Sequence, residues 1–528
     1  MRFGRRVRMT KWVGALILIT FILSGSSYSQ GQQKAQDPGE LYDAGMALFH
    51  KAKYEEAIDR FSKLILFFPT SKLYSYSRYM IGQSYLQMKK YEEALQQFEL
   101  YLKNFPNGDR VKEAEKGIQT SKEKLREKAS PPSLRPSNPG ERERKKTDEV
   151  KFSPPWQKTK RRICVQVFDL DVANFGEVEK GFKALKLAGV DTVILRVFQN
   201  RGGQIFKCAT PRHEEGVYFE TRHALVVDDL LGKVAEITRR NGLDLFAWIT
   251  TRHANYGFNG QPEYRCMGYN FETKRTEVAR GFNLFHPDVL RRLEGLFRDL
   301  GRTPIDGILF QDDLILRHNE DFSVEANSAF LKEFGYAPHP DLLYIDPYQS
   351  DSGKYYVKGY TSQFWTWANW KNRWLMNVAK RLMDAARESN PNLKFGINLY
   401  YETVVNSSNA LAWFSQTFSE ARERNFDYYA LMAYHRQTMQ EQNVEERKAI
   451  DLMAEVAGKA VRLAGDPSRV LMKLQVFDWK SVEVLPQREV EEVLTGVLNQ
   501  GPISLAFVPY VQQFPLHLLK EKWSTVSK

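Results

Sequence analysis

Cysteine and histidine are scarce in this chain, which has 528 residues but only three cysteines and nine histidines. Three cysteines are too few for a disulfide scaffold, and they lack the close spacing of zinc ligands. If export allows one bridge, Cys208 and Cys266 are the better pair, because both are expected in loops while Cys164 falls in an apolar run. No two histidines stand three or four positions apart, so the pattern does not indicate a metal site.

The signatures of nucleotide and cofactor chemistry are also missing. The segment FDLDVANFGEVEKG, which follows the first apolar run of the C-terminal part, has no G-x-G-x-x-G turn. The chain has neither a Walker loop nor a G-x-S-x-G nucleophile elbow. We therefore predict that the protein uses no metal and no cofactor.

The net charge of +12 is confined to two segments. Residues 1–36 carry six basic and no acidic side chains, and residues 128–162 carry eleven basic and four acidic ones. These segments account for the whole excess, so the rest of the chain is close to neutral. Because a nucleic-acid surface needs a basic footprint on a folded domain, we predict no nucleic-acid partner.

The first 29 residues have the layout of a secretory signal peptide, with an arginine-rich start, an apolar stretch from Trp12 to Leu23 and small polar residues up to Ser29. The apolar stretch is shorter than the roughly 20 residues of a spanning helix. We predict cleavage near Ser29 and a periplasmic or secreted protein. An uncleaved signal anchor is the alternative, and no other integral membrane segment is expected.

Two sequence units repeat with an offset of 37 residues. The stretches KYEEAIDRFSKLILFFP and KYEEALQQFELYLKNFP align Ala57 with Ala94 and Phe61 with Phe98. Each unit has the pattern of two amphipathic helices with a small residue where they approach, which resembles tetratricopeptide repeats. We predict a small all-α repeat domain over residues 38–128, which either binds a protein partner or serves as a spacer.

Residues 129–162 are rich in proline and basic residues and poor in aliphatic ones, which predicts a disordered linker. Beyond it, over residues 163–525, short apolar runs alternate with amphipathic helical patterns. Parallel strands that are covered on both sides read as unbroken apolar runs, so this order predicts an α/β domain, a (β/α)8 TIM-type barrel. An open doubly wound sheet is the alternative. The runs cover residues 163–170, 191–198, 243–250, 305–312, 393–400, 426–434, 470–477 and 503–510, and one of the helices is expected at 410–424.

In a barrel of this type the active site lies at the C-terminal ends of the strands. The residues at or near those predicted ends are mostly carboxylates, amides and aromatic rings, which suits a polyhydroxylated ligand that is neutral or cationic. His286 could instead cap the following helix. The candidate substrate-binding residues are Asp169, Asp171, Arg196, Trp248, His253, His286, Glu320, Asn398, Tyr400, Tyr434, Gln475, Trp479 and Tyr510.

Two adjacent aspartates, Asp312 and Asp313, stand where the fourth strand should end. Glycoside hydrolysis needs a proton for the leaving oxygen and a negative group that stabilises the oxocarbenium ion. Adjacent carboxylates in a partly dry cleft push their pKa values apart. We predict both as catalytic, with Asp312 as acid or nucleophile and Asp313 tuning it, because consecutive side chains of a strand face opposite sides. A turn or helix cap is the simpler alternative.

The stretch IDGILFQDDLILRHNEDFS, with NLFHPDV before it and LQVFDW after it, resembles the PgaB-type glycoside hydrolase domains. The resemblance spans most of residues 160–525, and the tandem aspartate followed by Glu320, Asp321 and Ser323 is its most specific part. It implies a barrel that cleaves partially deacetylated poly-β-1,6-N-acetylglucosamine, a biofilm polysaccharide, internally and outside the cytoplasm. The family places Asp312 at the catalytic centre.

Three positions depart from the pattern of that family. Gln311 replaces a histidine, and His318 and Lys473 replace acidic residues. A lost carboxylate would weaken the binding of glucosamine cations or remove a catalytic partner. We expect an exported glycoside hydrolase that acts on an amino-sugar exopolysaccharide, and the alternative is a catalytically silent polysaccharide-binding scaffold.

The repeats stand where PgaB proper carries a metal-dependent deacetylase domain. Because the chain also has no H-x-x-x-H pair, the resemblance does not imply deacetylase activity. Similar repeats occur in the exporter that works beside PgaB, so the resemblance implies docking to an export or envelope partner.

Overall fold

The computed structural model of the chain divides into two compact units. The predicted signal peptide and residues 130–158 of the predicted linker lie outside the described residues. The structure describes residues 38–129 and 159–524, apart from residues 68–70, 72, 107, 173, 204–205, 207–210, 255, 258–260, 351–352 and 354.

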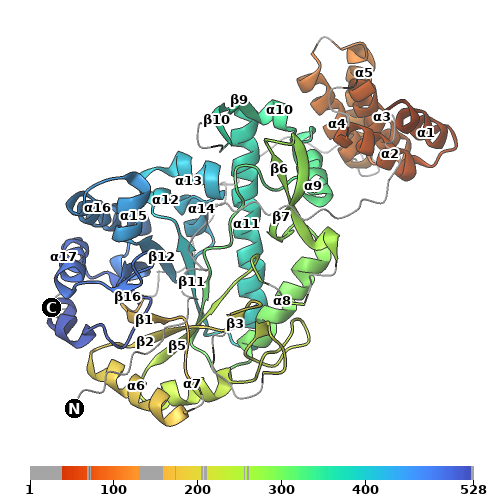
Figure 1. Ribbon diagram of the computed structural model, residues 1–528. Coiled ribbons are helices and arrows are strands. Elements are labelled where there is room, and N and C mark those ends of the chain that lie inside the picture. Colours follow the sequence, from red (N-terminus) through yellow and green to blue (C-terminus); the bar gives the residue numbers. More distant parts are fainter. Residues whose placement is uncertain are drawn as a thin grey trace, which may run out of the picture. The chain divides into compact units, whose positions relative to one another are not determined.

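The larger unit is built on eight parallel strands that close into a barrel (Figure 1). Each strand lies inside one of the predicted apolar runs, and pairing of the last strand with the first closes the ring at Ile163 and Leu505. The predicted (β/α)8 barrel is therefore confirmed, and the open sheet is excluded. In chain order the strands are β1 (Ile163–Val167), β2 (Thr192–Arg196), β5 (Asp244–Ile249), β8 (Gly307–Phe310), β11 (Lys394–Leu399), β12 (Tyr428–Ala433), β13 (Val470–Gln475) and β16 (Ser504–Val508).

Alternate side chains of these strands fill the barrel interior. Ile194 and Phe246 belong to one buried apolar cluster that includes residues from most of the strands. At the N-terminal end, Arg162 is buried, forms an ion pair with Asp244 at 2.6 Å and lies over the Phe246 ring. The Arg162 guanidinium, paired with Asp244, thus occupies the N-terminal end of the barrel.

Helices follow the strands and cover the outside of the barrel. The helix predicted at residues 410–424 is two helices, because Ser415 adopts the left-handed conformation with φ of +48° and Thr417 caps the second helix by accepting a hydrogen bond from the Glu420 amide at 3.3 Å. The covering helices are α6 (Phe175–Leu187), α7 (Leu231–Arg240), α8 (Pro287–Gly301), α11 (Ser362–Ser389), α13 (Ser407–Phe414), α14 (Phe418–Glu423), α16 (Glu446–Ala464) and α17 (Gln487–Leu498).

Shorter elements stand in the loops that connect the strands and helices. A hairpin of β6 (Arg265–Asn270) and β7 (Arg275–Phe282) precedes α8. Cys266 lies in β6 as a buried free thiol, not in a loop as expected, and Cys208 lies outside the described residues. The remaining short elements are β3 (Phe198–Gln199), β4 (Gly216–Val217), α12 (Glu402–Val405), α15 (His435–Gln442), β14 (Phe477–Asp478), β15 (Glu483–Val484) and α18 (Lys520–Ser524).

The smaller unit contains the predicted repeats. In each repeat a glycine of the first helix faces a phenylalanine of the second: a Cβ atom would lie 2.6 Å from the Phe61 ring at Gly45 and 2.7 Å from the Phe98 ring at Gly82. The repeated glycine therefore permits close helix packing. The helices are α1 (Pro38–His50), α2 (Tyr54–Phe67), α3 (Leu73–Gln87), α4 (Tyr91–Asn104) and α5 (Val111–Ala129).

A segment from within the barrel sequence, Val324–Phe364, groups with the repeat helices. It contains α9 (Val324–Phe334), α10 (Pro340–Leu343) and a hairpin of β9 (Tyr344–Gln349) and β10 (Tyr355–Tyr360). Leu331 of α9 joins the buried cluster of Phe61 and Ile81. Part of the repeat surface is therefore covered by the chain itself, a contact that the repeat pattern alone could not predict.

We expect Leu331→Ala to weaken the repeat helices. Removing a buried leucine side chain costs about 2–5 kcal/mol, and Leu331 is 8% exposed in the cluster. Hydrogen–deuterium exchange in α2 and α3 should therefore accelerate. Val324→Ala, at a position of the same helix that is 54% exposed, is the matched control and should leave exchange unchanged. Equal protection in both variants would show that α9 does not support the repeats.

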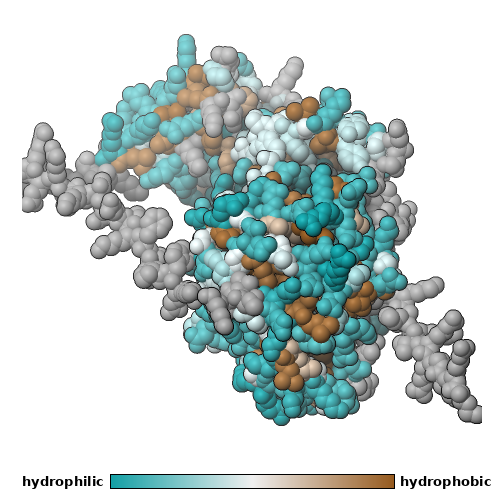
Figure 2. All heavy atoms as spheres, turned by 90° about the vertical axis from the view of Figure 1, so that its left-hand side faces the viewer, coloured by the Kyte–Doolittle hydropathy of each residue, from teal (hydrophilic) through white to brown (hydrophobic). Residues whose placement is uncertain are grey.

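One face of the molecule is seen with its surface coloured by hydropathy in Figure 2. On the face shown in Figure 2, hydrophilic residues predominate and hydrophobic residues form several separate small patches. Among the described residues, no helix combines the length and the apolar character that crossing a membrane requires.

Candidate active site

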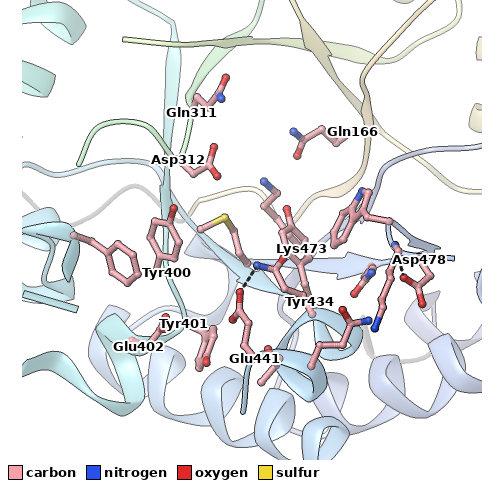
Figure 3. A pocket seen from close by; sticks show the side chains of 18 of the residues that line it. Gln166, Gln311, Asp312, Tyr400, Tyr401, Glu402, Tyr434, Glu441, Lys473 and Asp478 are labelled. Atoms are coloured by element: carbon pink, nitrogen blue, oxygen red, sulfur yellow. Dashed lines mark hydrogen bonds between the residues drawn. The ribbon is translucent and has the colours of Figure 1, made fainter. Parts of the chain in front are cut away.

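An open cavity of about 460 Å³ lies at the C-terminal end of the barrel strands. Residues in or just after six strands converge on it (Figure 3), and its volume falls in the range of ligand sites. The expected gathering of acidic, amide and aromatic groups at this end is therefore present. Six predicted site residues line the cavity: Trp248, Asp312, Tyr400, Tyr434, Gln475 and Trp479.

Asp312 follows β8 and is the acidic residue of the tandem pair that reaches the cavity. Burial raises the pKa of its carboxyl above the ordinary value. The Lys473 ammonium opposes this shift, and the neighbouring Asp313 carboxylate adds to it. Asp312 is thus a desolvated carboxylate on which burial and the Lys473 cation act in opposite directions.

Asp313 does not line the cavity, since its side chain turns to the loop that follows β5. Its carboxylate accepts hydrogen bonds from the amides of Thr251, Arg252 and His253 at 2.6–3.1 Å, and from the Thr250 and Thr251 hydroxyls. Burial alone would raise its pKa, but His253 and these hydrogen bonds together lower it. The position of Asp313 is that of a structural anchor, in contrast to the catalytic role that the sequence suggested.

Lys473 projects from β13 into the barrel. Its Nζ atom donates to Asn398 Oδ1 at 3.0 Å, and Asn398 in turn donates to the carbonyl of Phe310 at 2.9 Å. Burial lowers the pKa of Lys473 to about 8, and the charge of Asp312 opposes that shift. Lys473, which replaces an acidic residue of the family pattern, therefore places a cation in the lining of the cavity. Asn398, predicted to bind substrate, instead accepts a hydrogen bond from this lysine.

Aromatic rings form walls of the cavity. Tyr400 stacks on Phe414 with ring centroids 3.8 Å apart and nearly parallel planes, and the Arg317 guanidinium lies 5.2 Å from the same Phe414 ring. Tyr434 packs edge-on against Trp479 at 4.9 Å. These neighbours fix the orientation of the rings, and fixed aromatic faces suit the C–H faces of sugars.

Several buried polar atoms at the cavity have no hydrogen-bond partner in the described part of the chain. They are both amide atoms of Gln166, the Oε1 atoms of Gln311, Gln437 and Gln475, Nε1 of Trp248, and Oε2 of Glu402. Buried polar groups are rarely left without a partner, so such a cluster calls for an explanation. A ligand rich in hydroxyl and amide groups would satisfy it.

Three further carboxylates, Glu402, Glu441 and Asp478, line the cavity. In the view of Figure 3, Glu402 and Glu441 lie on the side opposite Gln311. Burial raises the pKa of Glu402 to about 7, and the Glu441 charge contributes in the same direction. With Asp312, the cavity therefore contains four acidic side chains.

A family model described as hypothetical glycosyl hydrolase family 13 matches residues 167–508, the barrel from the end of β1 to the end of β16. The chain belongs to this family. A second model, described as an outer membrane lipoprotein, matches residues 34–115, which include most of the repeat helices. The resemblance to a glycoside hydrolase domain is thereby confirmed at the level of the family.

Two proteins are similar to this chain at low identity. A curated protein of Escherichia coli strain K12, named poly-beta-1,6-N-acetyl-D-glucosamine N-deacetylase, is 22% identical over 268 residues, which cover 50% of this chain and 37% of that protein. The chain thus matches well under half the length of this relative. The solved glycoside hydrolase domain of PgaB (BpsB) from Bordetella bronchiseptica is 21% identical with a TM-score of 0.54, over 68% of this chain and 98% of that domain.

Several residues that were predicted to bind substrate do not line the cavity of this barrel. Two of them have other structural tasks: His286 caps α8 by accepting from the Asp288 amide at 3.2 Å, and Arg196 is buried against the Phe198 and Trp248 rings. Besides Asn398 and Asp313, the residues that do not line the cavity are Asp169, Asp171, Arg196, His253, His286, Glu320 and Tyr510.

His318, Glu320 and Asp321, in the part of the motif after the tandem aspartates, are buried and do not line the cavity. Glu320 forms a buried ion pair with Arg252 at 3.1 Å. Asp321 accepts from the amides of Met267 and Ser323 at 3.1 and 2.7 Å. His318 lies against aromatic rings, and burial lowers its pKa to about 3. These residues tie β6 to the loop after β8, so the predicted role of Glu320 in substrate binding is not supported.

The cavity residues missed from sequence differ in the signal that they carry. Glu402 stands three positions beyond the end of β11 and two positions after the predicted Tyr400. Its position after a strand end is therefore a signal that could have identified it. Gln166 lies inside an apolar run, and Glu441 lies on α15. At neither position does the sequence pattern indicate a side chain that faces the cavity. Among the described residues, no group of His, Cys, Asp and Glu side chains could hold a metal ion.

Proposed function

We propose that the protein is a glycoside hydrolase that cleaves an amino-sugar exopolysaccharide, partially deacetylated poly-β-1,6-N-acetylglucosamine. The observation that carries the proposal is the placement of Asp312 in an open cavity at the C-terminal end of a barrel that belongs to the hypothetical glycosyl hydrolase family 13. Enzymes with this fold place their catalytic groups at that end. The name of the curated relative, a poly-beta-1,6-N-acetyl-D-glucosamine N-deacetylase, supports the polymer.

The chemistry of the cavity supports this substrate class. Aromatic rings offer stacking surfaces for sugars, and the unpaired amide atoms of Gln166 and the unpaired Oε1 atom of Gln475 offer partners for hydroxyl and acetamido groups. The carboxylates Glu441 and Asp478 attract the ammonium groups that deacetylation exposes. A polymer with both acetylated and free amines would use both kinds of group.

The direct test is incubation of the purified full-length protein with partially deacetylated β-1,6-linked polymer, followed by size-exclusion chromatography. We expect shorter chains and new reducing ends. Fully acetylated polymer of the same linkage and β-1,4-linked chitosan are controls for the amine and the linkage. Intact polymer would contradict the proposal, and tight binding without cleavage would favour the silent scaffold instead.

We expect Lys473→Met to move the acid limb of the pH–rate profile to higher pH. The Lys473 cation favours the ionised form of Asp312 and so lowers the pKa of that carboxyl. Without the cation, Asp312 takes up a proton at higher pH, and the rate at pH 5 should fall by about tenfold more than the rate at pH 8. Lys448→Met, on the exposed side of α16, is the control. An unchanged profile would show that Lys473 does not act on the catalytic carboxylate.

We further propose that the protein is exported and that its repeat unit binds an envelope or export partner. The signal-like N-terminus and the match of residues 34–115 to an outer membrane lipoprotein model support this location. Fractionation of cells that produce the full-length chain, with detection in the periplasmic fraction and the medium, tests it.

A further inference from the structure

The cavity contains a second carboxyl group whose surroundings are the opposite of those of Asp312. Among the charged groups, the Lys473 cation has the largest effect on Asp312, whereas the carboxylate of Glu441 has the largest effect on Glu402, ahead of the Arg317 cation. A neighbouring cation favours the ionised form of an acid, and a neighbouring anion favours the protonated form. Pairs of acids in contrasting surroundings reveal which one donates a proton and which one carries charge.

Glu402 is held at the cavity by the turn that ends β11. The Thr403 amide and hydroxyl both donate to the carbonyl of Tyr400, at 3.0 and 2.7 Å. Tyr401 accepts from Gln442 Nε2 at 2.6 Å, which ties the turn to α15. The Glu402 side chain therefore projects from a fixed turn and not from a free loop.

One oxygen of the Glu402 carboxyl, Oε2, is buried and has no hydrogen-bond partner in the described part of the chain. An ionised carboxylate with an unpaired buried oxygen is unfavourable, while a protonated one can donate to a ligand in the cavity. Figure 3 shows Glu402 beyond Tyr400 from Asp312, so both acids lie along one side of the cavity.

We infer that Glu402 is the general acid of the proposed hydrolysis and that Asp312 acts as the ionised carboxylate. This inference rests on the proposed function. Glu402 delivers its proton to the glycosidic oxygen, the C–O bond to the anomeric carbon breaks, and its electron pair stays on that oxygen. Asp312 stabilises the positive charge that develops at the anomeric carbon. A water oxygen then bonds to that carbon, one water hydrogen remains on the new hydroxyl, and the other restores the Glu402 proton.

The charged and titratable groups that face Glu402 make its protonation sensitive to pH. They are Glu441 on α15, Arg317 after β8, and the hydroxyls of Tyr400 and Tyr401 on its own turn. Burial and Glu441 raise the pKa of Glu402 to about 7, and Arg317 opposes them. An acid must be protonated to act, so activity should be lost as the pH rises through this value.

The test measures the initial rate of reducing-end formation from partially deacetylated β-1,6-linked polymer between pH 4 and 9, with the full-length protein. For Glu402→Gln we expect kcat to fall by about 100-fold at pH 6, with KM changed by less than about threefold because the amide keeps the shape of the acid. The residual activity should lack the alkaline limb. Glu445→Gln, exposed at the start of α16, is the control and should match the wild type.

Glu441→Gln is the second variant, which keeps the inference testable if Glu402→Gln does not fold. Removing the Glu441 charge lowers the pKa of Glu402, so the alkaline limb should move to lower pH while the rate at pH 5 is retained. Two results would overturn the inference but not the proposed function, provided that the wild-type protein cleaves the polymer. One is undiminished cleavage by a folded Glu402→Gln variant, and the other is an alkaline limb that Glu441→Gln does not move. Intact polymer with the wild-type protein would overturn the proposed function as well.

Discussion

Asp312→Asn should abolish cleavage of the polymer, with a loss of at least about 10³-fold in kcat. The amide keeps the size of the side chain but cannot carry the negative charge that the transition state requires. Binding should persist, because the aromatic walls and the acidic groups of Glu402, Glu441 and Asp478 remain. The rate of reducing-end formation and a separate titration with a short oligosaccharide measure the two effects.

The variant should also be at least as stable as the wild type. Burial raises the pKa of Asp312, which means that the folded protein disfavours its ionised form, so at neutral pH removing the charge should not cost stability. Asp169→Asn is the matched control: this aspartate follows β1 at the same end of the barrel but is exposed and outside the cavity. If both variants retained wild-type cleavage, Asp312 would not be the catalytic carboxylate.

The order of the strands was readable from the sequence because buried parallel strands lack polar interruptions. All eight strands fall within predicted runs, and Asp312 lies at the end of β8 as predicted. The position at a strand end identifies residues such as Tyr400, and the alternation of side chains along a strand predicts that only one of two neighbours faces the ligand. Asp312 lines the cavity and Asp313 does not, but the local sequence does not show which backbone amides Asp313 binds instead.

Contacts between segments far apart in sequence are the part of the structure that local patterns do not predict. Glu320, which the sequence offers as a ligand contact, forms an ion pair with Arg252, 68 positions earlier, and does not line the cavity. The segment around Leu331 was assigned to the barrel, but it packs on repeat helices that precede it by more than 200 positions. Residue type and local periodicity do not predict such distant partners. A polar residue near a strand end therefore looks like a ligand contact even where another segment of the chain binds it.

Asp313→Asn should destabilise the barrel strongly, by about 3 kcal/mol or more. The wild-type carboxylate is buried and receives hydrogen bonds from three consecutive amides and two hydroxyls of the loop after β5. An asparagine would offer one acceptor oxygen and turn an NH2 group toward backbone donors, which leaves buried N–H groups without partners. A loss of this size is a large part of the stability of a typical domain, so the unfolding midpoint in urea should drop markedly.

The pH dependence separates this anchoring role from simple packing. Because the hydrogen bonds and His253 lower the pKa of Asp313 below its ordinary 3.8, its contribution to stability is present above that value and is lost as the pH falls through the folded-state pKa. The wild type should therefore lose stability more steeply on acidification below pH 4 than Asp313→Asn does. Asp312→Asn, one position away, is the control that should keep the acid sensitivity. The opposite result is that Asp313→Asn unfolds at the same urea concentration as the wild type and with the same pH dependence. That result would show that the Asp313 carboxylate does not hold the loop after β5.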